Sequence, residues 1–335
     1  MPSHETQVID LDQLISCDQK LDGDALLDVA IAVNDAFSNC GFLVVINHGV
    51  SQEKGTNLHE NAMRFFLETS NAEKTKCAFR SPIPRGYSGV SKENFAILAG
   101  ASRPNDLVEK YRMGPITTDS MSDSKEYQLM YYPNKWPDND TFELQSSMEA
   151  YYAEMERLPH LLLRIFEVAL KVPEGFFLQH MQNHTSILSV NHYPPIKKQI
   201  QKGQLRLAEH TDVDLFTILR PDYDDRYGCL QVRHPHDWQS VPIIPGSLVV
   251  NLGDCFSYWT NNHWKSTKHR VVIPQESEGQ ILSRLAMGFF VGLCYDAAIT
   301  RMPFIPIEAW RHKDTTYVDW RKDRIKQAMY NLQIQ

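Results

Sequence analysis

The sequence lacks a metal-binding cysteine motif, a long hydrophobic run and a signal peptide. Its six cysteines are scattered and form no Cys-x-x-Cys pair, which argues against a zinc or redox motif. No apolar stretch approaches the length of about 20 residues that spans a bilayer, and the N-terminus has neither the basic nor the apolar region of a signal peptide. We therefore expect a cytoplasmic protein with reduced thiols and no membrane partner.

The sequence also lacks a block of lysine and arginine. Its net charge of -7 is spread along the chain, so the electrostatic footprint of a nucleic-acid-binding protein is missing. We expect no nucleic-acid partner. Hydrophobic residues make up 42% and charged residues 22% of the 335 residues, which is typical of a globular protein with a sizeable core. No pattern predicts the oligomeric state.

The hydrophobic pattern divides the chain into three regions. Residues 1–150 mix helical and strand-like patterns, and residues 301–335 end in a charged helix over 317–332. A long amphipathic helix from Met148 to Leu170 leads into residues 151–300, where strand-like stretches are separated by turns. These stretches cover 186–193, 207–219, 229–233, 247–252, 267–273 and 281–291. We predict a mainly β fold with flanking helices: a jelly-roll core, that is, a double-stranded β-helix, after a mixed α/β N-terminal region.

A histidine and an aspartate lie two residues apart in the segment Ala-Glu-His-Thr-Asp that ends at Asp212. In a strand, alternate side chains share a face, so His210 and Asp212 can reach one metal ion. His269, on a later strand-like stretch, is the candidate for the third ligand. Two imidazoles and one carboxylate on one face of an ion suit iron(II), because open positions remain for a co-substrate and O₂. Taken alone the motif is weak, since such tripeptides also form surface hydrogen bonds.

Further short segments that resemble a known family are distributed along nearly the whole chain. They are Val-Ile-Asp-Leu (8–11), the stretch 41–50, Phe-Phe (65–66), Arg-Gly-Tyr (85–87), Asn-Lys-Trp-Pro (134–137), Asn-His-Tyr-Pro-Pro (191–195), Gly-Cys-Leu-Gln-Val (228–232) and Asn-Leu-Gly-Asp (251–254). Together they resemble the plant-and-fungal branch of the iron(II)/2-oxoglutarate dioxygenases, which includes isopenicillin N synthase. The gap of 59 residues between His210 and His269 is also close to the family's spacing. The resemblance implies that these two histidines and Asp212 bind iron.

The resemblance also implies 2-oxoglutarate and O₂ as co-substrates. Arg284 matches the arginine that grips the distal carboxylate of 2-oxoglutarate. Asn191 and Tyr193 match residues near its metal-bound end, although Tyr193 is equally well explained as a core tyrosine before a turn. The family usually has serine two residues after the arginine, whereas this chain has Ala286. The missing hydroxyl removes about 1 kcal/mol of inferred binding, which weakens 2-oxoglutarate binding without excluding it.

Substrate contacts are expected from inward-facing positions near the mouth of the barrel. Phe290 lies six residues beyond Arg284 on the same strand face, near a substrate-facing aromatic of the family, although core packing explains it as well. Lys110 and Arg112 share a strand face and favour a carboxylated substrate, whereas Tyr111 on the other face favours a flat apolar one. The N-terminal candidates are Tyr87, Phe95, Lys110, Tyr111 and Arg112.

We therefore predict an iron(II)- and 2-oxoglutarate-dependent oxygenase that hydroxylates, desaturates or cyclises a small molecule, with a carboxylated metabolite of specialised metabolism favoured. Two alternatives stay open. The first is an iron-dependent oxidase of the same fold that does not use 2-oxoglutarate, in which Arg284 serves another anion. The second is a non-catalytic barrel that only binds a ligand. The sequence decides neither the substrate nor the outcome of the reaction.

Overall fold

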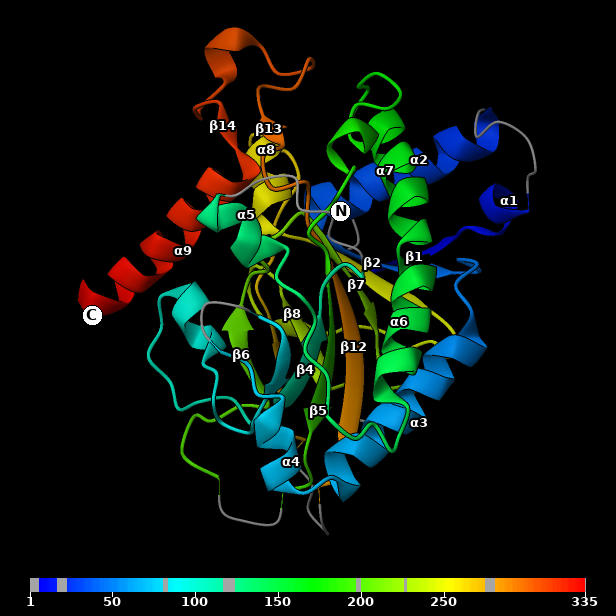
Figure 1. Ribbon diagram of the computed structural model, residues 1–335. Helices are drawn as coiled ribbons and strands as arrows, with labels where there is room; N and C mark the ends of the chain where they lie inside the picture. The colour runs from blue at the N-terminus through cyan, green and yellow to red at the C-terminus, as the bar shows by residue number, and fades with distance from the viewer. Residues whose placement is uncertain are drawn as a thin grey trace.

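The computed structural model describes residues 6–16, 23–80, 84–116, 124–196, 200–225, 228–274 and 281–334. Within them, two sheets build the barrel, and helices cover the outer face of the larger sheet (Figure 1). The predicted jelly-roll fold is confirmed. The division into three regions stays a prediction, and the first four strands of the N-terminal region lie in the same sheet as strands of the core.

The larger sheet has the strand order β1-β2-β10-β7-β12-β5-β4-β3, in which β1 and β2 pair parallel and all other neighbours pair antiparallel. The smaller sheet has the order β6-β11-β8-β9, and β13 (Ala298–Ile299) pairs with β14 (Thr315–Thr316) outside both sheets. The strands of the larger sheet are β1 (Gln7–Asp10), β2 (Phe42–Ile46), β3 (Gly86–Ser88), β4 (Glu109–Met113), β5 (Ile187–Tyr193), β7 (Phe216–Arg220), β10 (Leu248–Leu252) and β12 (Arg284–Val291). Those of the smaller sheet are β6 (Leu207–His210), β8 (Leu230–Arg233), β9 (Trp238–Ser240) and β11 (His269–Val271).

The helices begin at polar capping residues in several places. The hydroxyls of Ser51 and Ser70 accept hydrogen bonds from the main chain of the first turn of α3 and α4. None of the helices within the described residues is both long and apolar enough to cross a lipid bilayer. The α-helices are α1 (Asp12–Ile15), α2 (Asp24–Asn39), α3 (Gln52–Glu68), α4 (Asn71–Lys76), α5 (Lys125–Met130), α6 (Leu144–Met155), α7 (Arg157–Ala169), α8 (Asp254–Trp259) and α9 (Tyr317–Ile334), and the 3₁₀ turns are η1 (Phe95–Ala99), η2 (Leu178–His180) and η3 (Ile307–Ala309).

Two boundaries differ from the sequence-based prediction. The single helix predicted from Met148 to Leu170 is wrong, because the structure has α6 and α7, which meet at Glu156. Pro159 lies in the first turn of α7, where its missing N–H needs no helical partner, whereas inside a longer helix it would break the hydrogen-bond ladder. The strand-like stretch 207–219 is likewise divided into β6 and β7, which belong to different sheets.

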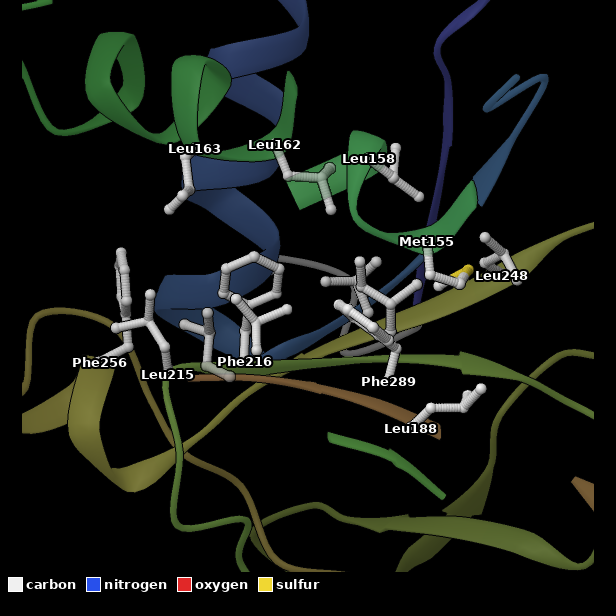
Figure 2. Close-up of a cluster of buried hydrophobic side chains, with 14 of the residues drawn as sticks. Met155, Leu158, Leu162, Leu163, Leu188, Leu215, Phe216, Leu248, Phe256 and Phe289 are labelled. Carbon is white, nitrogen blue, oxygen red and sulfur yellow. The ribbon is translucent and has the colours of Figure 1, made fainter. Parts of the chain in front are cut away.

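The barrel wall separates two hydrophobic clusters. The larger cluster lies between the helices and the outer face of the larger sheet, where Leu162 and Met155 of α7 and α6 lie over Phe216 and Phe289 (Figure 2). The smaller cluster joins residues of both sheets inside the barrel. Alternation along β5 sends Leu188 to the outer cluster and Tyr193 to the inner one. The inner face of β5 therefore faces the site.

The outer cluster predicts a large stability effect at Leu162, which is 1% exposed. Leu162→Ala should lower the free energy of unfolding by about 2–5 kcal/mol, because it deletes buried methyl groups and leaves a cavity. Denaturant unfolding measures this. The matched control is Leu67→Ala, whose leucine is 57% exposed, and it should change the free energy by less than about 0.5 kcal/mol. Equal losses in both variants would contradict the packing described above.

Candidate metal centre

Three buried side chains meet where β6 and β11 lie side by side. His210 is the last residue of β6 and His269 the first residue of β11, and the two are directly paired in register. Oδ1 of Asp212 lies 3.6 Å from Nε2 of His210 and 3.7 Å from Nε2 of His269. The three candidate ligand atoms all lie within 4.8 Å of one another. One ion can therefore contact all three residues.

Asp212 reaches this position in a different way from the one expected. The sequence argument placed it on the strand face of His210, but β6 ends at His210 and Asp212 lies in the following loop. Its carboxylate is aimed by two residues of the larger sheet. Thr217 Oγ1 and Asn251 Nδ2 both donate to Oδ2, at 2.6 and 2.7 Å. This holds Oδ2 and leaves Oδ1 facing the imidazoles.

The two histidines are oriented by their own main chain. Nδ1 of His210 lies 2.7 Å from the carbonyl oxygen of Ala208, and Nδ1 of His269 lies 3.1 Å from that of Thr267. A hydrogen bond to a carbonyl requires the proton on Nδ1, so each Nε2 presents its lone pair toward Asp212. Such bonds fix the tautomer that a metal ligand needs.

The charge state of the site also suits a cation. Burial, and to a smaller extent the neighbouring His269, lower the pKa of His210 to about 3. Burial alone would raise the pKa of Asp212, but His269, His210 and the hydrogen bonds from Thr217 and Asn251 bring it below its ordinary value. At neutral pH His210 is thus a neutral imidazole and Asp212 a carboxylate, the forms that bind a metal. This donor set fits iron(II).

A second group of buried residues lies at the start of β12. The guanidinium carbon of Arg284 is 5.0 Å, and that of Arg206 5.9 Å, from the ring centre of Tyr193. Arg284 Nε donates to Asp225 at 2.9 Å, and Arg206 Nη2 donates to the carbonyl of Leu282 at 2.5 Å. Among the described residues, Arg284 Nη1 and Arg206 Nε are buried without a hydrogen-bond partner. Two such cationic donors fit the distal carboxylate of 2-oxoglutarate.

This arrangement changes two expectations about the co-substrate. Tyr193, expected near its metal-bound end, pairs with Arg284 in register and therefore lies at the arginine end. Sequence reasoning missed Arg206, because its place beside Arg284 depends on contacts between distant segments. The one feature of the sequence that could have indicated a role for Arg206 is its position four residues before His210. Arg206 places a second guanidinium beside the ring of Tyr193, on which Arg284 also lies.

The structure brings some of the predicted substrate residues close to the metal ligands. The ring of Phe95 lies edge-on to His210, with 4.9 Å between the ring centres, and Lys110 Nζ lies 3.6 Å from the centre of Phe95. Lys110 and Arg112 do share a face, but Glu93 already pairs with both, at 3.2 and 2.6 Å. A substrate carboxylate would have to displace Glu93 to bind them.

Strand parity divides the remaining candidates between the two faces of the larger sheet. Asn191 lies opposite Lys110 and accepts a hydrogen bond from Ser189 at 2.8 Å, and Phe290 lies opposite Thr217. Tyr87 and Tyr111 face the other way. They pack against Phe65 of α3, and their hydroxyls donate to Glu109 and to the carbonyl of Lys135. The structure does not bring Tyr87 or Tyr111 together with the metal ligands.

Two family models match the chain. Residues 7–139 match the N-terminal region described as "non-haem dioxygenase in morphine synthesis N-terminal", and residues 184–293 match the "2OG-Fe(II) oxygenase superfamily". The validamycin A dioxygenase of Streptomyces hygroscopicus subsp. limoneus is 31% identical over 256 residues, which cover 75% of this chain and 68% of that protein. A 2-oxoglutarate-dependent dioxygenase of Penicillium fellutanum is 28% identical over 324 residues, which cover 89% of this chain and 89% of that protein.

A solved structure agrees over nearly the whole chain. A full-length Neurospora crassa protein, crystallised in complex with alpha-KG, superimposes with a TM-score of 0.79 at 25% identity and covers 95% of each chain. A jelly roll that carries two histidines and a carboxylate defines a non-haem iron oxygenase. With the matches above, this chain belongs to the iron(II)/2-oxoglutarate-dependent oxygenases. It is an oxidoreductase, and its predicted cofactors, iron(II), 2-oxoglutarate and O₂, are confirmed.

The hydrogen bond from Thr217 to Asp212 should contribute to metal affinity. Thr217→Val removes the hydroxyl and keeps the shape, so Asp212 loses one of the two bonds that aim it. We expect iron(II) to bind about 10- to 100-fold more weakly, as is usual when a partner of a ligand is removed, in an anaerobic titration. Thr211→Val is the control, because the hydroxyl of Thr211 donates to Asp254. Equal weakening in both variants would assign the loss to the loop.

Arg206 should contribute to the binding of 2-oxoglutarate. Arg206→Met should raise the dissociation constant about tenfold or more, because a hydrogen bond to a charged group is worth about 1.5–3 kcal/mol. The visible charge-transfer band of the iron complex reports the titration under anaerobic conditions. Arg233→Met, at an exposed arginine of β8, should leave the constant unchanged. An unchanged constant in Arg206→Met would mean that Arg206 only holds Leu282.

Proposed function

We propose that this enzyme oxidises a C–H bond of a small carboxylated metabolite. Two observations carry the 2-oxoglutarate-dependent oxidation: Arg284 Nη1 and Arg206 Nε are buried without a hydrogen-bond partner among the described residues, and His210, Asp212 and His269 can hold one metal ion. One group binds a co-substrate carboxylate and the other a metal. The name of the Streptomyces relative, validamycin A dioxygenase, supports a small-molecule substrate.

The residues divide the work of the reaction between them. Bound iron(II), with 2-oxoglutarate and O₂, supplies the oxidising chemistry, and the co-substrate leaves as succinate and CO₂. His210, Asp212 and His269 hold the metal, while Thr217 and Asn251 keep the carboxylate of Asp212 aimed at it. Arg284 and Arg206 orient the co-substrate from the start of β12.

Aromatic residues border the reacting centre. Phe95 lies against His210. Phe290 of β12 is partly buried and pairs with Thr217 of β7. Both can exclude water and hold an apolar part of the substrate near the metal. Whether hydroxylation, desaturation or ring closure follows depends on how the substrate is held. The 2-oxoglutarate route accounts for the buried arginine pair better than an oxidase without this co-substrate does.

We also propose the cytoplasm as the place of action. The five cysteines within the described residues, Cys40, Cys77, Cys229, Cys255 and Cys294, are free thiols, which supports a reducing compartment. Cys17 lies outside the described residues.

Co-substrate binding and turnover test the proposal together. Anaerobic addition of iron(II) and 2-oxoglutarate should produce the visible charge-transfer band of the chelate, and admission of O₂ with substrate should release succinate. His269→Ala should abolish both signals, whereas His263→Ala, at an exposed histidine, should keep them. Iron that is bound without the band, or product that forms without succinate, would refute the use of 2-oxoglutarate.

A further inference from the structure

A cavity of about 340 Å³ lies between α5, α9 and the start of β5. Much of its wall is apolar, with Leu129 and Met130 from α5, Ile187 from β5, and Val318 and Ile325 from α9. Its volume is in the range of small-molecule sites. The cavity can therefore hold a compact apolar group.

A series of paired strands links the cavity to the metal centre. Ile187 pairs with Phe290 between β5 and β12, and Phe290 pairs with Thr217 between β12 and β7. Thr217 in turn donates to the ligand Asp212. Asp214, two residues beyond Asp212, also lines the cavity. Two strand pairs and one hydrogen bond therefore connect the cavity wall at Ile187 with the ligand Asp212.

The acidic residues of the cavity are already paired. Asp214 accepts hydrogen bonds from Arg321 Nε at 2.9 Å and from the hydroxyl of Tyr317 at 2.8 Å. Glu126 pairs with Lys322 at 3.0 Å. Both cations come from α9 and balance the charge of these carboxylates. Neither carboxylate is left to balance a further cation.

Arg85 is that further cation, and it is deeply buried. Its side chain is 3% exposed and lines the cavity just before β3. Nη1 and Nη2 donate to the carbonyls of Pro84 and Met130, at 3.1 and 2.8 Å, whereas Nε has no hydrogen-bond partner among the described residues. Within the same part of the chain, Arg85 forms no salt bridge with an acidic group.

The electrostatic surroundings of Arg85 call for an anion. Burial, together with the nearby cations Arg321 and Arg112, lowers the pKa of Arg85 to about 10. The guanidinium is still charged at neutral pH. A buried charge without a counter-ion is costly, and a carboxylate that accepts two hydrogen bonds from arginine removes that cost. Lys110 and Arg112, which are paired with Glu93, have no such need.

We propose that Arg85 binds the carboxylate of the substrate, whose apolar part fills the cavity toward the metal. This deepens the proposed function and rests on it. The ligand class is a small carboxylic acid with an apolar body. The carboxylate selectivity first assigned to Lys110 and Arg112 thereby moves to Arg85.

Matched acids and amides test the charge requirement. The probes are arylalkanoic acids with two to four methylenes, beginning with 3-phenylpropanoate, and their primary amides. Calorimetry is performed on the anaerobic enzyme saturated with iron(II) and 2-oxoglutarate, so that the co-substrate site is filled. At least one acid should bind about tenfold more tightly than its amide. Equal affinity of acid and amide in every pair would overturn the proposal.

Variants locate the charge. Arg85→Gln should abolish the preference for the acid and leave the dissociation constant of 2-oxoglutarate unchanged. Lys125→Gln neutralises an exposed cation of the same cavity and should keep the preference. A preference that survives Arg85→Gln, or that Lys125→Gln removes equally, would contradict the role of Arg85.

Arg85 also packs against the main chain, because a Cβ at Gly114 would lie 2.1 Å from its Nη2, so its removal can impair folding. Val318→Trp is therefore a second variant that keeps Arg85 and fills the cavity. It should abolish binding of the acid, and binding that persists would place the acid elsewhere. A preference for the acid without the charge-transfer band of 2-oxoglutarate would keep the anion site and reject the proposed reaction.

Discussion

The carboxylate of Asp212 is the point on which the arrangement of the site depends. It lies in the loop that leaves the smaller sheet, and its Oδ2 is held by Thr217 of β7 and Asn251 of β10, both in the larger sheet. These two bonds therefore connect the sheets at the metal centre and set the direction of Oδ1. Because three buried polar groups satisfy one another there, the loop can place a charge inside the barrel that would otherwise be costly to bury.

The same balance of buried charge explains which cations are available for ligands. Glu93 pairs with Lys110 and Arg112, so that their inward orientation does not make them an open anion site. Burial alone would raise the pKa of Glu93, but these two cations hold it well below its ordinary value, and the group stays a charged partner. Arg284 has one nitrogen on Asp225 and another without a partner, and Arg85 has no acidic partner within the described residues. The buried cations that can still bind an anionic ligand are therefore Arg284, Arg206 and Arg85.

Strand patterns and family segments in the sequence predicted the jelly roll, the iron and the co-substrate. They also selected His210, Asp212 and His269, which the structure brings within reach of one ion. The prediction from hydrophobic and polar patterns was wrong where it extended a strand or a helix past its actual end. Asp212 is not on β6, and Pro159 divides the helix predicted through it. Arg206 and Glu93 were missed because local sequence does not encode which distant charges share a buried space.

The two proposed anion sites lie at opposite ends of one strand pair. Arg284 pairs with Tyr193 at one end of β5 and β12, and Phe290 pairs with Ile187, which lines the cavity of Arg85, at the other end. Six residues along a strand correspond to roughly 20 Å, which is longer than 2-oxoglutarate. A single co-substrate molecule therefore cannot occupy both sites. This separation lets one barrel accept two carboxylates at once and keeps the co-substrate from competing for the position of the substrate.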